Sequence, residues 1–157
     1  MKEAFKRGLS FGMISGIITV LGILVGMYSL SHSRLYVFGS ILLVAFADSL
    51  SDAFGMHISE ESVTKNKNNI WKATYSTLMT KMVISLSFLV PILIFPLNFA
   101  IMASSLWGVL LITLVSYRLA KKNKTRVFTT ISEHLSITFI VIVLTYYLGQ
   151  FIPLIFN

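Results

Sequence analysis

Residues 8–30 read GLSFGMISGIITVLGILVGMYSL and contain no charged side chain. A helix crosses the hydrocarbon core of a bilayer with about 20 apolar residues, so this stretch is long enough for one span. The whole chain has the same character: 55% of its 157 residues are hydrophobic, 12% are charged, and the mean hydropathy is +0.82. Soluble domains carry about 25% charged residues. We therefore expect an integral membrane protein, and the composition argues against a soluble enzyme, a disordered chain and a nucleic-acid-binding protein.

Four further apolar runs follow the first. We expect a single domain, residues 1–157, with five spans at roughly 8–30, 36–57, 76–96, 98–117 and 134–156. Pro91 and Pro96 suit the end of the third span, where a freed carbonyl finds another partner. The polar connections at roughly 58–74 and 118–132 are too short to fold alone. The predicted fold class is an all-α integral membrane protein with five transmembrane helices.

Basic residues divide unequally between the alternate ends of these spans. With the N-terminus placed inside, the outer side receives only Arg34, and Lys81 lies just within the third span, where we expect it to snorkel. The inner side receives Lys2, Lys6, Arg7, Lys65, Lys67, Lys72, Arg118, Lys121, Lys122, Lys124 and Arg126. Because short cytoplasmic connections are rich in Lys and Arg, we expect the N-terminus in the cytoplasm and the C-terminus outside. The membrane would be the cytoplasmic membrane of a prokaryote, or otherwise an organelle membrane.

Two acids, Asp48 and Asp52, lie inside the second span. A carboxylate near the bilayer centre costs ~3 kcal/mol on insertion scales, which favours a functional role. The two acids share one helix face, and Met56 and Glu60 continue this stripe toward the cytoplasmic end. Carboxylate oxygens with one thioether suit a borderline divalent cation such as Fe²⁺ or Mn²⁺, so these four residues are the predicted metal ligands. The alternatives are a structural hydrogen-bond network for the two Asp and a solvated interfacial charge for Glu60.

Small residues line one face of the first span. The repeat from Gly12 to Gly16 allows close approach of helix backbones. This face serves either close packing within one subunit or a homodimer interface that also lines a path. On the dimer hypothesis Gly12 and Gly16 pack the interface, and Ser15 and Thr19 line the pathway.

Other sequence features point away from catalysis. The chain has no cysteine, which excludes disulfides and thiolate chemistry. It also lacks a glycine-rich phosphate loop, a zinc-protease motif and a nucleophile elbow, so we expect no enzymatic activity. His57 and His134 are interpreted as interfacial residues, with a proton relay as the alternative for His134.

The order of these motifs resembles the vacuolar iron transporter (nodulin-21-like) family. The first span, GLSFGMISGIITVLGILVGM, resembles the opening helix of that family, and AFADSLSDAFGMHISEES at 45–62 resembles its second helix. The prolines of the third span, the basic connection after Arg118 and the closing TYYLGQFIP are also similar. The resemblance covers nearly the whole chain. It implies five spans with the N-terminus inside, and a homodimer that exports Fe²⁺ or a related divalent metal from the cytoplasm in exchange for protons.

The chain departs from the family pattern at three places. Ser15 stands where the family has an acidic residue before a glycine. In residues 51–57, SDAFGMH, methionine and carboxylate have exchanged places relative to the family's S-M-x-x-G-E-Y. The long Glu-rich cytoplasmic metal-binding insert is reduced to the connection at 58–74.

These features lead to two alternative functions. The first is a divergent short member of the family, a proton-coupled transporter with a divalent metal ion as substrate and no permanently bound cofactor. Its expected partners are membrane lipid and a second copy of the chain, without nucleic acid. The second is a non-transporting assembly or regulatory protein on the same scaffold, which the loss of the acid at Ser15 favours.

Overall fold

The computed structural model describes residues 2–156, which form helices and short connections without strands; Met1 and Asn157 lie outside the described residues. In chain order the elements are α1 (Lys2–Ser31), α2 (Arg34–Leu43), the π-helical turn η1 (Val44–Asp48), α3 (Ser49–Val63), α4 (Lys67–Ser87), α5 (Leu89–Ile94), α6 (Leu97–Asn123) and α7 (Val127–Phe156). Five helical segments are long and apolar enough to cross a membrane. They are Glu3–Ser31, Arg34–Val63, Lys67–Ile94, Leu97–Asn123 and Val127–Phe156. The all-α class and the five candidate spans are thus confirmed.

The polar connections are shorter than the sequence predicted. Only residues 64–66 separate α3 from α4, and only residues 124–126 separate α6 from α7. Asn66 is the N-cap of α4, and its side chain accepts hydrogen bonds from two backbone N–H groups of the first turn. The predicted connections at 58–74 and 118–132 are therefore mostly helical, since Lys, Arg, Glu and Leu favour helix wherever no proline interrupts them.

The third span is interrupted near its end, where the sequence placed two prolines. Pro91 has no N–H to donate and its ring crowds the carbonyl of Ser87, so α4 ends there and the short α5 follows. Pro96 lies immediately before α6 and separates it from α5. The prolines therefore divide the third span from the fourth, as expected.

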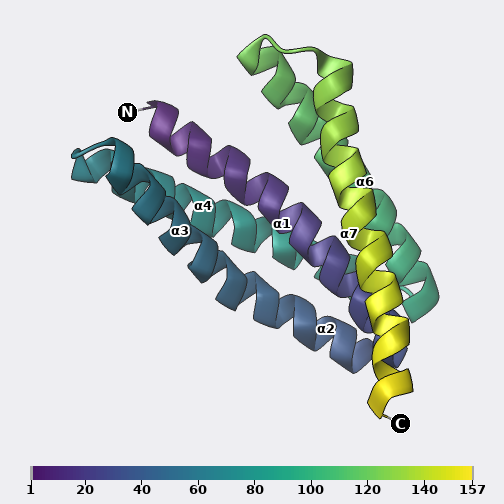
Figure 1. Ribbon diagram of the computed structural model, residues 1–157. Coiled ribbons are helices and arrows are strands. Elements are labelled where there is room, and N and C mark those ends of the chain that lie inside the picture. The colour runs from purple at the N-terminus through teal and green to yellow at the C-terminus, as the bar shows by residue number, and fades with distance from the viewer. Residues whose placement is uncertain (1, 157) are drawn as a thin grey trace.

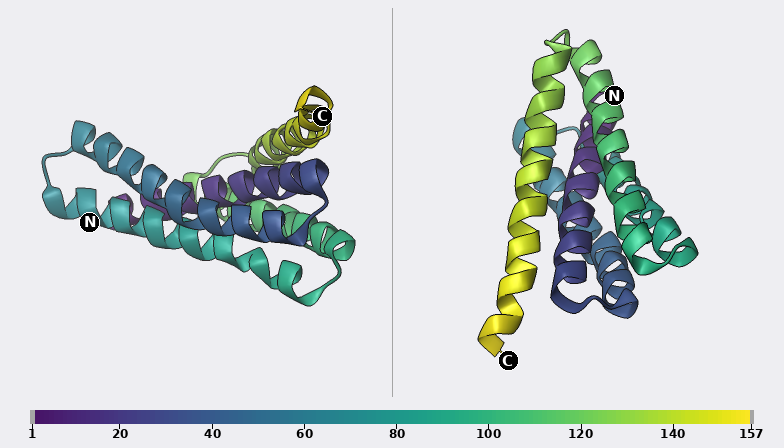
Figure 2. Two further views of the ribbon diagram at one scale, coloured as in Figure 1. Left: turned by 90° about the horizontal axis from the view of Figure 1, so that it is seen from below. Right: turned by 90° about the vertical axis from the view of Figure 1, so that its right-hand side faces the viewer.

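Helix α1 occupies the centre of the bundle. It contacts α2, α3, α4, α6 and α7, and half of the residues in its most apolar stretch are buried. Two groups of helices share it: α2, α3 and α4 on one side, and α6 with α7 on the other (Figure 1). The groups converge at the end that holds the α1–α2 and α5–α6 connections and diverge toward the other end (Figure 2). The N-terminus and the 64–66 and 124–126 connections lie at this diverging end, which we call the basic end.

The glycines of α1 allow these close contacts within one chain. A Cβ added at Gly12 would lie 2.8 Å from the carbonyl oxygen of Thr77, and one at Gly16 would lie 3.3 Å from Cγ of Lys81. Both neighbours belong to α4, and α7 fills the face at Gly22 in the same way. Close packing within one subunit is therefore the alternative that the structure shows, and α4 occupies the face that the dimer hypothesis assigned to Gly12 and Gly16.

Candidate functional site

Lys81 lies in the interior of the bundle, with its side chain only 1% exposed. Its Nζ lies 2.5 Å from Oδ2 of Asp48 and forms a second ion pair with Oδ2 of Asp52. The prediction that Lys81 snorkels to the membrane surface is therefore wrong. The ammonium turns toward the second span because two carboxylates there compensate its loss of hydration.

Ser15 of α1 completes this group. Its Oγ donates a hydrogen bond of 2.6 Å to Oδ2 of Asp52 and accepts one of 3.0 Å from Nζ of Lys81. Ser15, Asp48, Asp52 and Lys81 are called the Lys81 cluster below. Thr19, the other predicted pathway residue, lies one turn further along α1 and is half-buried. The cluster therefore joins the first, second and third spans through charged and polar groups inside the otherwise apolar bundle.

The π-helical turn places the first of the two acids. η1 ends at Asp48, and Asp52 follows one α-helical turn later, so both carboxylates reach Lys81. Single π turns insert one extra residue into a helix and occur frequently at functional sites. The side chains of Asp48 and Asp52 remain 34% and 22% exposed. Neither acid is therefore as fully enclosed as Lys81.

The position of Lys81 follows from a stripe of small and polar residues on α4. The members of this stripe recur every four residues and are buried: Ala73, Thr77, Lys81 and Ser85. Thr77 donates a hydrogen bond of 3.2 Å to the carbonyl of Gly8, which holds the stripe against α1. Tyr75, Met79 and Val83 are exposed on other faces of α4. Small residues four positions before and after Lys81 were thus the feature of the sequence that could have predicted a buried Lys81.

Glu60 lies apart from the Lys81 cluster. Arg7 donates two hydrogen bonds to its carboxylate, from Nε at 2.6 Å and from Nη2 at 2.8 Å. The Glu60 side chain is 4% exposed, and two helical turns, about 12 Å along the axis, separate it from Asp52. This bidentate pair holds the end of α3 against α1. The structure therefore does not bring Glu60 to the other predicted metal ligands.

Met56 lies on α3 between Asp52 and Glu60 and is half-buried. Within residues 2–156, no three His, Asp or Glu side chains gather as a group that could hold a metal ion. Of the four predicted ligands, the structure brings together Asp48 and Asp52. It adds Lys81, to which the sequence analysis assigned no functional role.

The two histidines considered in the sequence each link neighbouring helices. Nδ1 of His57 lies 3.0 Å from Oγ1 of Thr74, between α3 and α4. Nδ1 of His134 lies 2.7 Å from Oγ of Ser116, between α6 and α7. Each therefore serves helix packing in this structure.

A polar cavity of about 640 Å³ opens at the basic end beside the Arg7–Glu60 pair. Its walls come from the first turns of α1, the end of α3 and the start of α4. Arg7 and Glu60 both line it, and Met56 and then Asp52 follow along α3 toward the bundle interior. The ion pair thus lies between this cavity and the Lys81 cluster.

Comparison with known proteins finds no matching family model, no matching curated protein and no matching solved structure.

Proposed function

We propose that the protein is a membrane transporter that moves a divalent metal ion of the Fe²⁺ or Mn²⁺ type, in exchange for protons. Export from the cytoplasm is the direction that the family resemblance implies. The observation that carries the proposal is the placement of Asp48, Asp52 and Lys81 together inside the bundle. Ionisable groups at this depth are costly, and they commonly mark ion and proton pathways.

The charges of the cluster give a reason for coupling. With no metal bound, two carboxylates and one ammonium sum to one negative charge. The Lys81 ammonium occupies the two carboxylates in the present structure, so a divalent cation between them would be repelled by its charge. A cation and a proton would compete for the same carboxylate oxygens, which is the condition for exchange.

Access to the cluster is proposed from the basic end. A cation would enter the polar cavity, pass the Arg7–Glu60 pair and reach Asp52 along α3, with the Met56 thioether as a soft ligand on the way. The bidentate Arg7–Glu60 pair closes this route in the present conformation. Ser15 would orient Asp52, since it already donates to that carboxylate.

A homodimer remains part of the proposal because the family resemblance implies it. The face at Gly12 and Gly16 is filled by α4 of the same chain. A second copy would therefore dock on another surface of the bundle.

A second candidate is the non-transporting assembly or regulatory protein. The specific observation in its favour is that each of the three acids already has a cationic partner, Lys81 for the two Asp and Arg7 for Glu60. On this hypothesis the ion pairs serve only to hold α1, α3 and α4 together.

Calorimetric Mn²⁺ binding by the purified protein in detergent separates the two candidates. We expect binding by the wild type that is stronger at about pH 8 than at about pH 6, because protons are more abundant at the lower value and compete for the carboxylates. Asp52→Asn should weaken binding at both values, because it removes one of two charged ligands. Glu61→Gln is the matched control, since Glu61 is an exposed acid on the same helix. If the Asp52→Asn protein binds Mn²⁺ as the wild type does, the non-transporting candidate replaces the transporter.

A further inference from the structure

We propose that a groove between α1, α4 and α6 binds one anionic phospholipid from the leaflet at the basic end. The groove has a volume of about 540 Å³ and lies where the two helix groups begin to diverge. It is separate from the Lys81 cluster and from the polar cavity beside Glu60. Its rim is basic and its walls are apolar, which is the combination that a phospholipid requires.

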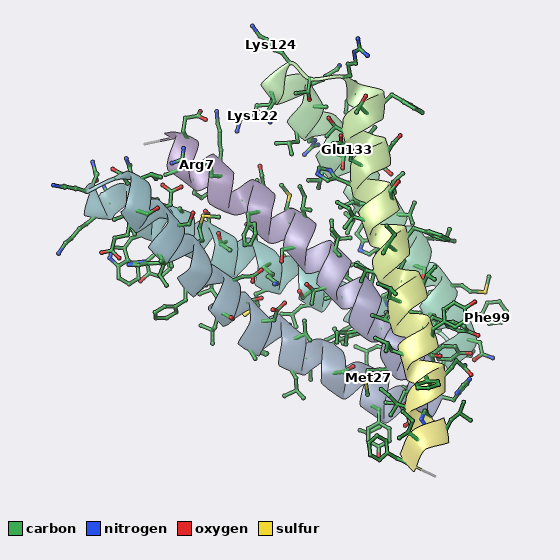
Figure 3. The ribbon with its side chains drawn as sticks, viewed as in Figure 1. Arg7, Met27, Phe99, Lys122, Lys124 and Glu133 are labelled. Atoms are coloured by element: carbon green, nitrogen blue, oxygen red, sulfur yellow. The ribbon has the colours of Figure 1, made fainter. Side chains whose placement is uncertain are left out.

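Three basic side chains form the rim of this lipid groove. Lys6 comes from α1, and Arg118 and Lys122 come from the last turns of α6. Glu3 lies 3.2 Å from Nζ of Lys6 and 4.0 Å from Nζ of Lys122, so the four residues together carry two positive charges. Figure 3 shows Lys122 projecting from α6 toward the start of α1, near which Arg7 is labelled. The rim therefore attracts a phosphate group and repels the divalent cation proposed as substrate.

Apolar side chains continue from the rim into the depth of the bundle. Leu9 and Met13 line the groove from α1, and Leu111 and Leu114 line it from α6. From Lys122 to Leu111 the groove follows α6 for about 16 Å, at 1.5 Å per residue. This length is about half of a hydrocarbon core of about 30 Å, so the groove matches the depth of one leaflet. An acyl chain thus fits along the walls while its headgroup stays at the rim.

A lipid in this place would hold the two diverging helix groups together. At this level α6 contributes one wall and α1 with α4 the other. The phosphate would add a shared anionic partner for Lys6 of α1 and Arg118 of α6, beside the existing carboxylate of Glu3. The groove therefore favours an anionic headgroup over a zwitterionic one.

Acyl-chain quenching of a tryptophan in the groove tests this proposal. The two native tryptophans, Trp71 and Trp107, lie outside the groove and are replaced by Phe, and Leu114→Trp supplies the reporter. The full chain is reconstituted in phosphatidylcholine bilayers that contain increasing fractions of phosphatidylglycerol with brominated acyl chains. A parallel series uses brominated phosphatidylcholine. We expect half-maximal quenching at a several-fold lower fraction of phosphatidylglycerol than of phosphatidylcholine.

Two triple variants with equal loss of charge show whether the rim is responsible. Replacement of Lys6, Arg118 and Lys122 by Gln should abolish this several-fold preference, because each basic residue near an anionic lipid contributes a factor of about five. The control replaces Lys65, Lys72 and Arg126, which lie at the same end but do not line the groove. The control should keep the preference. Equal quenching by both lipids, equal loss in both variants, or displacement of the lipid by millimolar inorganic phosphate would each overturn the proposal.

Discussion

Lys81 of α4 and Asp48 at the end of η1 form an ion pair inside the helix bundle, with 2.5 Å between Nζ and Oδ2. The lysine is fully buried, and a second carboxylate and a serine hydroxyl share its ammonium. Two acids thus share one base, and this excess of acids distinguishes the cluster from a one-to-one ion pair. The proposed cation binding depends on the second acid.

Replacement of Lys81 by Met should strengthen cation binding. The ammonium pairs with both carboxylates, so its removal frees them for a cation. We expect Lys81→Met to bind Mn²⁺ at least about tenfold more tightly than the wild type at about pH 6, because one full charge is no longer in the site. Calorimetry measures this, with Lys67→Met as control, since Lys67 is an exposed lysine on the same helix. Unchanged binding by a folded Lys81→Met protein would show that Lys81 does not compete with the cation.

The Arg7–Glu60 pair should contribute to stability at the basic end. Arg7→Met leaves the carboxylate of Glu60 buried without its two donors, which costs about 2 kcal/mol for a charge-assisted hydrogen-bonded group. The double variant Arg7→Met with Glu60→Met should recover part of this loss, because no unpaired charge remains. Thermal unfolding in detergent measures both. A double variant that is no more stable than the Arg7→Met protein would contradict this account.

The sequence was sufficient to predict the five long apolar helices and the two acids within the second of them, because apolar length and the rarity of acids in apolar runs are local signals. It did not predict the partners of those acids. Lys81 was assigned to the membrane surface because it lies near the end of an apolar run. Which side of α4 packs against α1 depends on contacts between helices, which the sequence does not give. Glu60 was assigned to the same ligand group as Asp52 from its spacing along the helix. Its carboxylate instead pairs with the guanidinium of Arg7, which lies 53 residues away in the chain. Such pairs are decided by tertiary contacts rather than by periodicity.

Replacement of glycine by alanine should lower the stability of the protein in α1 and raise it in α3. In Gly12→Ala the new Cβ would lie 2.8 Å from the carbonyl oxygen of Thr77, so α1 and α4 must separate and stability falls. Gly55→Ala meets nothing within 4 Å and should raise stability by up to about 1 kcal/mol through helix propensity alone. Thermal unfolding of the two variants in the same detergent gives the comparison. Equal shifts of the same sign would show that α4 does not pack on this face of α1.

Labelling of single cysteines tests the orientation that the basic residues indicate. The chain has no cysteine of its own, so Ser33, Asn68, Asn98 and Asn123 can be replaced one at a time. Ser33 and Asn98 lie at one end of the bundle, and the exposed Asn68 and Asn123 lie at the basic end. An impermeant thiol reagent outside intact cells should label the first pair only. Labelling of Asn68 or Asn123 from outside would contradict an N-terminus in the cytoplasm.

Manganese flux into proteoliposomes is the most direct test of the transport account. Vesicles with an inner pH of about 6 and an outer pH of about 8, which bracket neutrality as above, supply the proton gradient, and an internal dye reports Mn²⁺ entry. The wild type should move Mn²⁺ into the vesicles and protons out of them, at a rate that falls when the gradient is removed. The variant with both Asp48→Asn and Asp52→Asn should lose this flux, and Glu61→Gln should keep it. Equal Mn²⁺ entry through the wild type and the Asp48→Asn, Asp52→Asn variant, or no entry above that of empty vesicles, would contradict the assignment of transport to the Lys81 cluster.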